Sequence, residues 1–205
     1  MHVRPAACVA LSLALFASAS ALAAQPLAFV STCLQAEDDI DTIATTLIDQ
    51  GWEQVGKTSE TAVSDLSWVL SSYYFNSDSG GESVTSILEL QTKTAAAMLK
   101  KKDIPQSKSR IFVRDTDDAP ETLRVTWQQP IETLTEYGCQ AALSASSTTT
   151  LRGDASDDLP AFFAMPLQNI GNGYAAFTLL NAAKLAPLTP PNAIVITQAE
   201  RRGES

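Results

Sequence analysis

The sequence predicts a single α+β domain in which two to three helices pack on a mostly antiparallel sheet held by one disulfide. Three observations lead to this fold class. Helical periodicity is confined to the first half of the chain, short β-branched and aromatic runs fill the second half, and two cysteines remain after an N-terminal export segment. Because the helices precede the strands, we expect them to cover one face of the sheet.

The first 23 residues have the pattern of a cleaved export signal. Arg4 gives a positive start, an apolar stretch runs from about residue 6 to residue 17, and Ala21-Leu22-Ala23 is a typical cleavage sequence. The stretch is shorter than the ~20 residues that span a bilayer. We therefore expect a signal peptide over 1–23, one domain over 24–200 and a disordered tail over 201–205, in a protein of the bacterial periplasm or extracellular space.

Charge and histidine content narrow the possible functions. The chain has 23 Asp plus Glu against 14 Lys plus Arg, a net charge of −9. Such a surface repels phosphate backbones, so no nucleic-acid partner is expected. The only histidine, His2, lies in the export segment. The mature chain is therefore expected to lack a Ser-His-Asp triad or a histidine zinc site.

Cys33 and Cys139 are the two cysteines of the mature chain. An even count in an oxidising compartment predicts a disulfide between them. The alternative is a reactive thiol at Cys33, in front of a helix that begins near Ala36. No C-x-x-C motif accompanies it, and the disulfide is the favoured interpretation.

The first half of the chain is predicted to form one strand and then helices. The apolar segment 27–34 is short enough to be a strand. A helix follows, with an apolar face of Ile40, Ile43, Ala44, Leu47 and Ile48, and ends at Gly51. Further helices are expected over 61–75 and 82–102, the latter closing with three lysines that suit a helix C-terminus.

From residue 109 onward the pattern changes to strands. Segments 110–115, 121–129 and 133–144 are rich in β-branched and aromatic residues and are separated by polar turns, which predicts consecutive antiparallel strands. Segments 161–170 and 174–185 fit strand or helix, and 192–198 is predicted to be a last strand.

Gly51 to Thr58 match the phosphate-loop pattern G-x-x-x-x-G-K-[ST], through Gly51, Gly56, Lys57 and Thr58. A working phosphate loop lies between a buried strand and a helix. Here the residues before Gly51 have helical periodicity, so this glycine is better explained as a helix stop. We interpret the match as coincidental and expect no nucleotide site.

Two acidic loops are candidate calcium sites. Their residues are Asp115, Asp117, Asp118 and Glu121 in one loop and Asp154, Asp157 and Asp158 in the other. Calcium favours oxygen-rich loops, but neither loop has the spacing of the known twelve-residue calcium loop. Solvated turns are the favoured interpretation. No cofactor is expected, with calcium as the alternative.

Aromatic residues supply the candidate partner surface. Trp68, Tyr73, Tyr74 and Phe75 lie close together in the sequence, and Tyr and Trp are enriched at interfaces. The three tryptophans, Trp52, Trp68 and Trp127, are also ordinary core residues, which is the favoured interpretation for each.

These observations favour an exported, non-catalytic binding or accessory protein whose partner is another envelope protein or polymer. A carboxylate-based hydrolase of a cell-envelope polymer is one alternative, because acids remain available for catalysis. A calcium-binding structural or adhesion module is another.

The export segment generates a direct prediction. A tag-free copy purified from the export compartment is expected to lack about its first 23 residues, because signal peptidase cleaves after small residues such as Ala23. N-terminal sequencing measures this, and a mature chain that still begins at Met1 would contradict it.

Overall fold

The computed structural model describes residues 27–35, 39–56, 59–77, 79–152 and 158–202. The predicted signal peptide lies outside these residues. The described chain forms one α+β domain whose sheet has eight strands, with neighbouring strands antiparallel throughout. The strands are β1 (Glu53–Gln54), β2 (Ser107–Arg114), β3 (Glu121–Ile131), β4 (Leu134–Leu143), β5 (Phe162–Ala164), β6 (Gln168–Ile170), β7 (Gly173–Leu180) and β8 (Ala193–Arg202).

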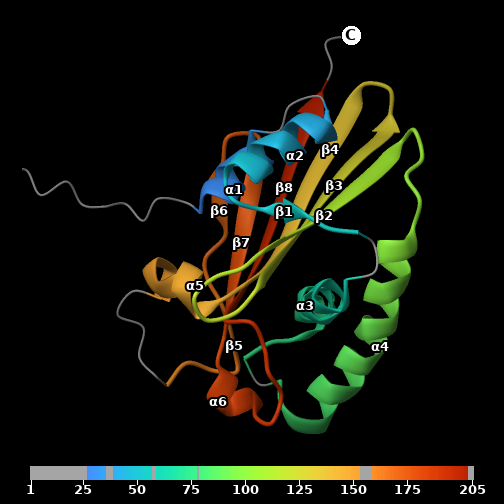
Figure 1. The fold of residues 1–205 in the computed structure, drawn as a ribbon. Coiled ribbons are helices and arrows are strands. Elements are labelled where there is room, and N and C mark those ends of the chain that lie inside the picture. Colours follow the sequence, from blue (N-terminus) through green and yellow to red (C-terminus); the bar gives the residue numbers. More distant parts are fainter. Residues whose placement is uncertain (1–26, 36–38, 57–58, 78, 153–157, 203–205) are drawn as a thin grey trace, which may run out of the picture.

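The strand order places the predicted meander and the last strand side by side. The order is β1-β2-β3-β4-β8-β7-β5, and β6 also pairs with β7 (Figure 1). The three consecutive strands predicted from the sequence are β2, β3 and β4, and the predicted last strand is β8. Because β8 pairs with β4, the C-terminal strand lies in the middle of the sheet. It extends to Arg202, two residues into the segment predicted to be a disordered tail.

Helices α1 (Ala28–Leu34) and α2 (Ile40–Asp49) cover one face of the sheet (Figure 1). The prediction of a strand over 27–34 is wrong. Phe29, Val30, Cys33 and Leu34 are all buried, and their spacing of one, four and five residues forms one side of a helix. That side packs on β4 and β8, so the apolar run is buried without pairing to a strand.

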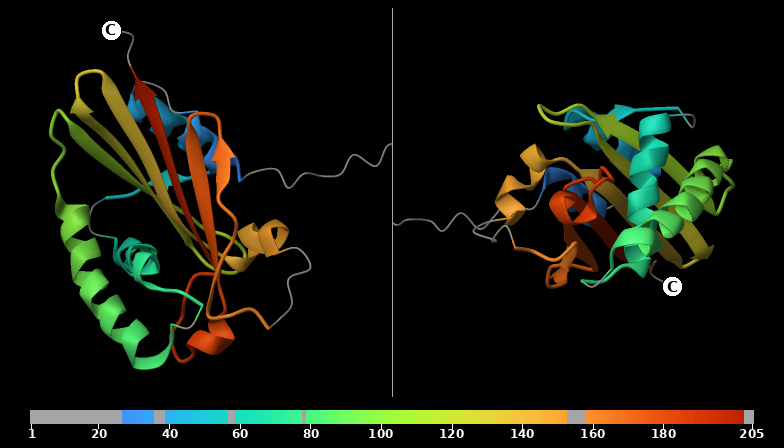
Figure 2. Two further views of the ribbon diagram at one scale, coloured as in Figure 1. Left: turned by 180° about the vertical axis from the view of Figure 1, so that it is seen from behind. Right: turned by 90° about the horizontal axis from the view of Figure 1, so that it is seen from below.

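Helices α3 (Glu60–Ser71) and α4 (Gly81–Lys100) lie on the opposite face, linked through the short 3-10 helix η1 (Ser72–Tyr74) (Figure 2). The expectation that the helices share one face is therefore wrong. Side-chain alternation along the strands explains why. In β8, Ala193 and Val195 join the core under α1 and α2, whereas Ile194 joins the core under α3 and α4. Both faces of β8 are apolar around residues 193–195, so helices pack on both faces and bury these side chains.

The described residues contain six α-helices, more than the two to three predicted. The additional ones are short: α1 replaces the predicted first strand, and α5 (Ala145–Arg152) and α6 (Ala182–Leu185) follow strand ends. The α5 segment is rich in Ser and Thr, which have modest helix propensity. Its N-terminus is capped by the side chain of Asp118, from a distant loop, a contact that local sequence patterns do not reveal.

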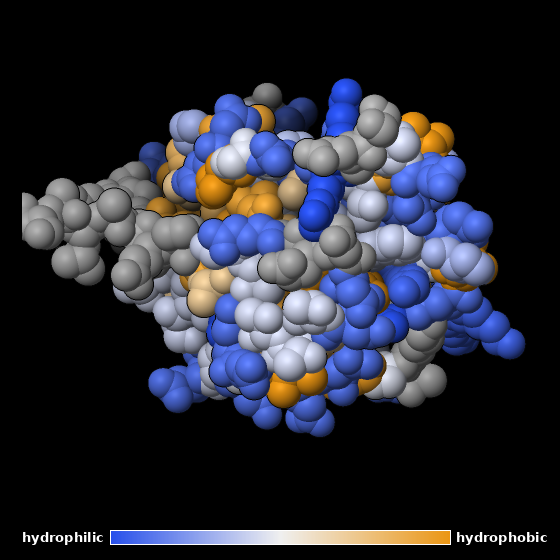
Figure 3. Space-filling view, turned by 90° about the horizontal axis from the view of Figure 1, so that it is seen from above, coloured by the Kyte–Doolittle hydropathy of each residue, from blue (hydrophilic) through white to orange (hydrophobic). Residues whose placement is uncertain are grey.

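The core divides into an apolar layer on each face of the sheet. Trp52 and Trp127 belong to the layer under α1 and α2, and Trp68 belongs to the layer under α3 and α4. All three are buried, which confirms their predicted role. Seen from above, the described surface is mostly hydrophilic, and hydrophobic residues show in small separate groups (Figure 3).

The predicted disulfide joins Cys33 of α1 to Cys139 of β4. Both cysteines are 1% exposed. The bond therefore fastens the first helix to the middle of the sheet from inside the core, across a sequence separation of 106 residues.

Replacing both cysteines, Cys33→Ala with Cys139→Ala, is expected to lower the free energy of unfolding by about 4–5 kcal/mol, because the unfolded chain loses a long closed loop. Urea unfolding of the variant and the wild type measures the difference, and wild-type protein in reductant should behave like the variant. Equal unfolding midpoints for oxidised wild type and variant would contradict the prediction.

Candidate functional site

The face of the sheet that carries α3 becomes polar beyond the end of that helix. Cross-strand pairing aligns one row across the central strands, consisting of Thr126, Gly138, Gln198 and Tyr174. The neighbouring row toward α3 contains Arg124, Gln140 and Ile196. Because side chains alternate along a strand, both rows point to the α3 side.

The residues of these rows other than Arg124 line the floor of a hollow of about 260 Å³, which we call the sheet groove. We define it by the polar side chains Tyr73, Thr126, Gln128, Glu136, Gln140, Tyr174 and Gln198. Tyr73 comes from η1 at the end of α3, and the others come from the sheet. The lining is therefore made of hydroxyls, amides and one carboxylate, with no basic side chain among the described residues that line it.

Gly138 keeps the floor of the groove low. A Cβ atom at this position would lie 2.8 Å from Oγ1 of Thr126, closer than real Cβ atoms approach. The Thr126 hydroxyl instead donates a hydrogen bond of 3.1 Å to the Gly138 carbonyl. Any larger residue would push Thr126 aside and raise the floor.

A hydrogen-bonded chain orients the amide of Gln140. Nη1 of Arg124 donates to Oε1 of Gln140 at 2.9 Å, and Nε2 of Gln140 donates to the hydroxyl of Tyr73 at 3.3 Å. Arg124 forms no ion pair with any described residue. Burial lowers the pKa of its guanidinium from the ordinary value, and the nearby Tyr73 opposes this shift. A partly desolvated cation thus fixes which end of the amide faces the groove.

A second pair orients Gln198 in the same way. The hydroxyl of Tyr174 donates to Oε1 of Gln198 at 2.9 Å. The Nε2 group of Gln198 then has both hydrogens left for other acceptors. Gln140 and Gln198 therefore both present amide N–H donors from adjacent strands.

The far end of the groove is negative. Glu136 lines the groove, and its cross-strand partner on β8 is Glu200. Neither carboxylate forms an ion pair with a described residue. Two like charges on adjacent strands repel each other, so this end of the groove disfavours a further negative charge.

The candidate aromatic surface is divided by the turn that follows α3. Trp68 is buried between the helices and the sheet, whereas Tyr73 is 60% and Tyr74 63% exposed. Phe75 is half-buried and its ring lies 4.5 Å from that of Phe162, measured between centroids. Tyr73 is one wall of the sheet groove, and the exposed Tyr74 follows it in η1.

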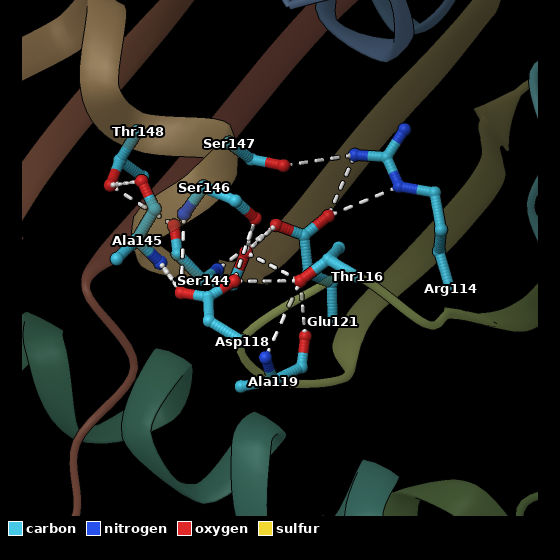
Figure 4. A network of polar contacts seen from close by, with 10 residues as sticks. All are labelled: Arg114, Thr116, Asp118, Ala119, Glu121, Ser144, Ala145, Ser146, Ser147 and Thr148. Atoms are coloured by element: carbon cyan, nitrogen blue, oxygen red, sulfur yellow. Dashed lines mark hydrogen bonds and ion pairs between the residues drawn. The ribbon is translucent and has the colours of Figure 1, made fainter.

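The first acidic loop is engaged in structural contacts (Figure 4). Asp118 accepts hydrogen bonds from the backbone N–H groups of Ala145 and Ser146, at 2.8 and 3.2 Å, and from the hydroxyls of Ser146 and Thr116. These contacts, led by the Ser146 hydroxyl, hold the pKa of Asp118 well below its ordinary value. Asp118 thus serves as the cap of α5.

Glu121 is fully buried on the face opposite the groove and has a partner for each oxygen. Oε2 accepts from Nη2 and Nε of Arg114 at 2.6 and 3.1 Å, and Oε1 accepts from the backbone N–H and hydroxyl of Ser144. The guanidinium of Arg114 also lies 4.3 Å from the ring centroid of Trp52. A buried charge is tolerated when it is paired and hydrogen-bonded in this way.

The other candidate calcium ligands are not brought together. Asp115 and Asp117 are exposed, Asp158 pairs with Lys184 at 3.1 Å, and Asp154 and Asp157 lie outside the described residues. Within the described part of the chain, no group of three or more His, Cys, Asp or Glu side chains is arranged to hold a metal ion. Whether calcium binds stays an open prediction.

The phosphate-loop match begins at a helix end. Gly51 follows α2 with a φ of 88°, a left-handed conformation that glycine adopts readily. β1 comes after this glycine and pairs at the edge of the sheet with β2. Gly56 is exposed, and Lys57 and Thr58 lie outside the described residues. The local order of helix, glycine and strand is the reverse of a phosphate loop.

Asp65 of α3 lies against the groove-side face of the sheet. Its Oδ2 accepts a hydrogen bond of 2.6 Å from the hydroxyl of Thr122. Burial raises the pKa of Asp65 to about 6, the hydrogen bond from Thr122 opposes the shift, and the charge of Glu121 adds to it. Glu121 and Thr122 are consecutive in β3 and point to opposite faces, so the two buried carboxylates do not face one cleft.

No protein-family model, curated protein or solved structure matches this chain. No helix among the described residues has the length and apolar character needed to cross a bilayer.

The sequence alone did not indicate the groove. Its floor residues alternate with core residues: Thr126 follows Val125, Gln140 follows Cys139, and Gln198 follows Thr197. Alternation of this kind is typical of any half-exposed strand. Only the row alignment across β3, β4, β8 and β7 shows that these polar positions adjoin one another.

The raised pKa of Asp65 predicts a pH-dependent stability. The folded state holds this proton more tightly than the unfolded state, so the contribution is fully present below about pH 4 and is lost as the pH rises through about 6. Asp65→Asn, whose amide oxygen can still accept from Thr122, is expected to raise the free energy of unfolding at pH 7.5 by about 2 kcal/mol.

Urea unfolding of wild type and variant at pH 4 and pH 7.5 measures this difference. Asp117→Asn is the matched control, because it removes the same charge from an exposed turn. An Asp65→Asn variant that gains no more stability at pH 7.5 than the control would contradict the prediction.

Proposed function

We propose that this chain is an exported, non-catalytic binding or accessory protein that recognises another component of the cell envelope through the sheet groove and the adjoining tyrosines. Two features support export. The N-terminal segment has a signal-peptide pattern, and the disulfide between Cys33 and Cys139 is of a kind that persists in oxidising compartments.

The exposure of Tyr73, in the wall of the groove, and of its chain neighbour Tyr74 carries the proposal. More than half of each side chain is open to solvent, although Tyr has enough apolar area to favour burial. Such residues are enriched at binding surfaces because they combine apolar area with a polar tip. The adjoining groove adds the amide N–H groups of Gln140 and Gln198, and of these only one N–H of Gln140, bonded to Tyr73, has a described partner.

One observation favours a hydrolase as the second candidate. Glu136 and Glu200 are cross-strand partners at the end of the groove, and carboxylate pairs perform glycoside hydrolysis when they flank a bound substrate. Cleavage of an oligosaccharide that is lost on Glu136→Gln would establish this function. The fully engaged Glu121 is a poor candidate, because each of its oxygens already has a protein partner.

Site-specific photo-crosslinking tests the binding proposal. A photoreactive phenylalanine analogue in place of Tyr73 or Tyr74 is expected to give a discrete adduct in cells, because each side chain lies at the proposed contact surface. Mass spectrometry of the adduct identifies the partner. The control position is Thr45, which is exposed on α2 across the sheet from the groove.

An adduct at Tyr73 or Tyr74 that is absent at Thr45 supports the proposed surface. Equal adducts at all three positions, or none at the tyrosines, would contradict it.

A further inference from the structure

We infer that the sheet groove binds an uncharged saccharide, one unit of a longer glycan chain. The inference deepens the proposed binding function and rests on it. It is carried by the fixed orientation of the groove's amides, by the charge at its far end and by the absence of an open strand edge along its floor.

The near end of the groove is a cluster of oriented donors. Arg124 occupies Oε1 of Gln140, so the amide N–H₂ group turns toward Tyr73, and one of its hydrogens has no described partner. Tyr73 accepts that bond, which leaves its own O–H to donate. Across the groove, Tyr174 occupies Oε1 of Gln198 and leaves that amide's N–H₂ free. A ligand here must offer several acceptor oxygens.

The far end offers acceptors. The carboxylate of Glu136 accepts hydrogen bonds only, when ionised, and the amide of Gln128 lines the groove beside it. Sugar hydroxyls both donate and accept, so a single ring can satisfy donors at one end and acceptors at the other. Each polar group of the groove then gains a partner, which is the condition for desolvating it without penalty.

Charge argues against anionic ligands. The groove lining contains Glu136, whose neighbour is Glu200, and no basic side chain among the described residues. Arg124 lies in the row nearer α3 and is not among the lining residues, and its Nη1 donates to Gln140. The chain as a whole carries a net charge of −9. A phosphate, sulfate or uronate would therefore be repelled.

The topology argues against an extended peptide. Peptides that bind to sheets add a strand at an open edge. The strands that form the floor are β3, β4, β8 and β7, and each is paired on both sides. Their backbone groups are therefore already used, and only side chains face the groove.

The size fits part of a larger ligand. The hollow of about 260 Å³ is below the range of about 300–1,000 Å³ that encloses drug-sized molecules. The groove therefore suits a single sugar unit, with the chain continuing past the exposed ring of Tyr73, whose apolar face can pack on the C–H groups of a neighbouring unit.

Binding of defined oligosaccharides to the disulfide-bonded mature protein tests the inference. A printed array of neutral oligosaccharides, followed by calorimetric titration with maltotetraose, chitotetraose and the acidic tetragalacturonate, is the experiment. We expect at least one neutral saccharide to bind with millimolar or tighter affinity, and tetragalacturonate to bind more weakly. The double variant Gln140→Leu with Gln198→Leu is expected to weaken neutral binding at least about tenfold, through the loss of two donors.

Gln168→Leu is the matched control, because it makes the same change at an exposed position of β6. It should bind like the wild type, and thermal melts confirm that both variants fold. Neutral binding that survives the double variant, or tetragalacturonate binding that exceeds neutral binding, would overturn the inference. So would the absence of any neutral saccharide on the array and in the titrations.

The crosslinking experiment distinguishes failure of the saccharide inference from failure of the proposed binding function. No saccharide binding together with a discrete protein adduct at Tyr73 overturns the saccharide inference and leaves the binding function standing. No saccharide binding and no adduct at Tyr73 or Tyr74 overturns both.

Discussion

The two-residue alternation of β4 is the constraint on which the rest of the structure depends. Cys139 points into the core and bonds to Cys33 of α1, while its neighbours Gly138 and Gln140 point into the sheet groove. Residues 138–140 of β4 therefore place the disulfide on one face of the sheet and part of the groove floor on the other. The backbone N–H of Cys139 adds a hydrogen bond of 3.3 Å to Thr197 of β8. The disulfide therefore stabilises the strand from which the groove's amide projects.

The buried carboxylates on the two faces of the sheet differ in the number of hydrogen-bond partners they have. Under α1 and α2, Glu121 is paired with Arg114 and Ser144, so its charge is offset by neighbours from β2 and from the start of α5. Under α3, Asp65 has only the hydroxyl of Thr122 and carries a raised pKa. The first network joins β2, β3 and the residue before α5 at one corner of the fold. Burial of Asp65 favours its protonated form, although the hydrogen bond from Thr122 favours the ionised form, so the stability of the α3 side depends on pH.

Most of the strands and long helices were predictable because their patterns are local. The apolar spacing of α2, with Ile40, Ile43, Ala44 and Leu47 buried, and the meander of β2 to β4 depend only on neighbouring residues. Segment 27–34 was predicted wrongly because its short, mostly apolar sequence fits either a strand or a helix. The segment is helical because it packs on β4 and β8 and forms the disulfide from Cys33 to Cys139. These contacts join residues far apart in the sequence, so local patterns do not reveal them.

The candidate site was only partly predictable for the same reason. Tyr73 and Tyr74 belong to the aromatic cluster that the sequence singled out, but the burial of Trp68 and the turn through η1 depend on where α3 ends. The groove residues of β4, β7 and β8 come from segments far apart in the sequence, and only strand pairing brings them into neighbouring rows. The capping of α5 by Asp118 could not be predicted for the same reason, because the acidic loop lies far from the helix in the sequence and meets it only in the folded structure.

The placement of Arg124 links the fold to the chemistry of the groove. A cation in direct contact with a ligand would select for negative charge, but Arg124 is not among the residues that line the groove, and it donates a hydrogen bond to the carbonyl oxygen of Gln140 behind them. Its effect is to hold a neutral amide in one of its two orientations, and Tyr174 does the same for Gln198. Because these amides are already oriented in the free protein, less side-chain conformational entropy is lost when a ligand binds. A groove built this way gains specificity from the direction of its donors while its own net charge stays negative at Glu136, which is why the ligand it suits is polar and uncharged.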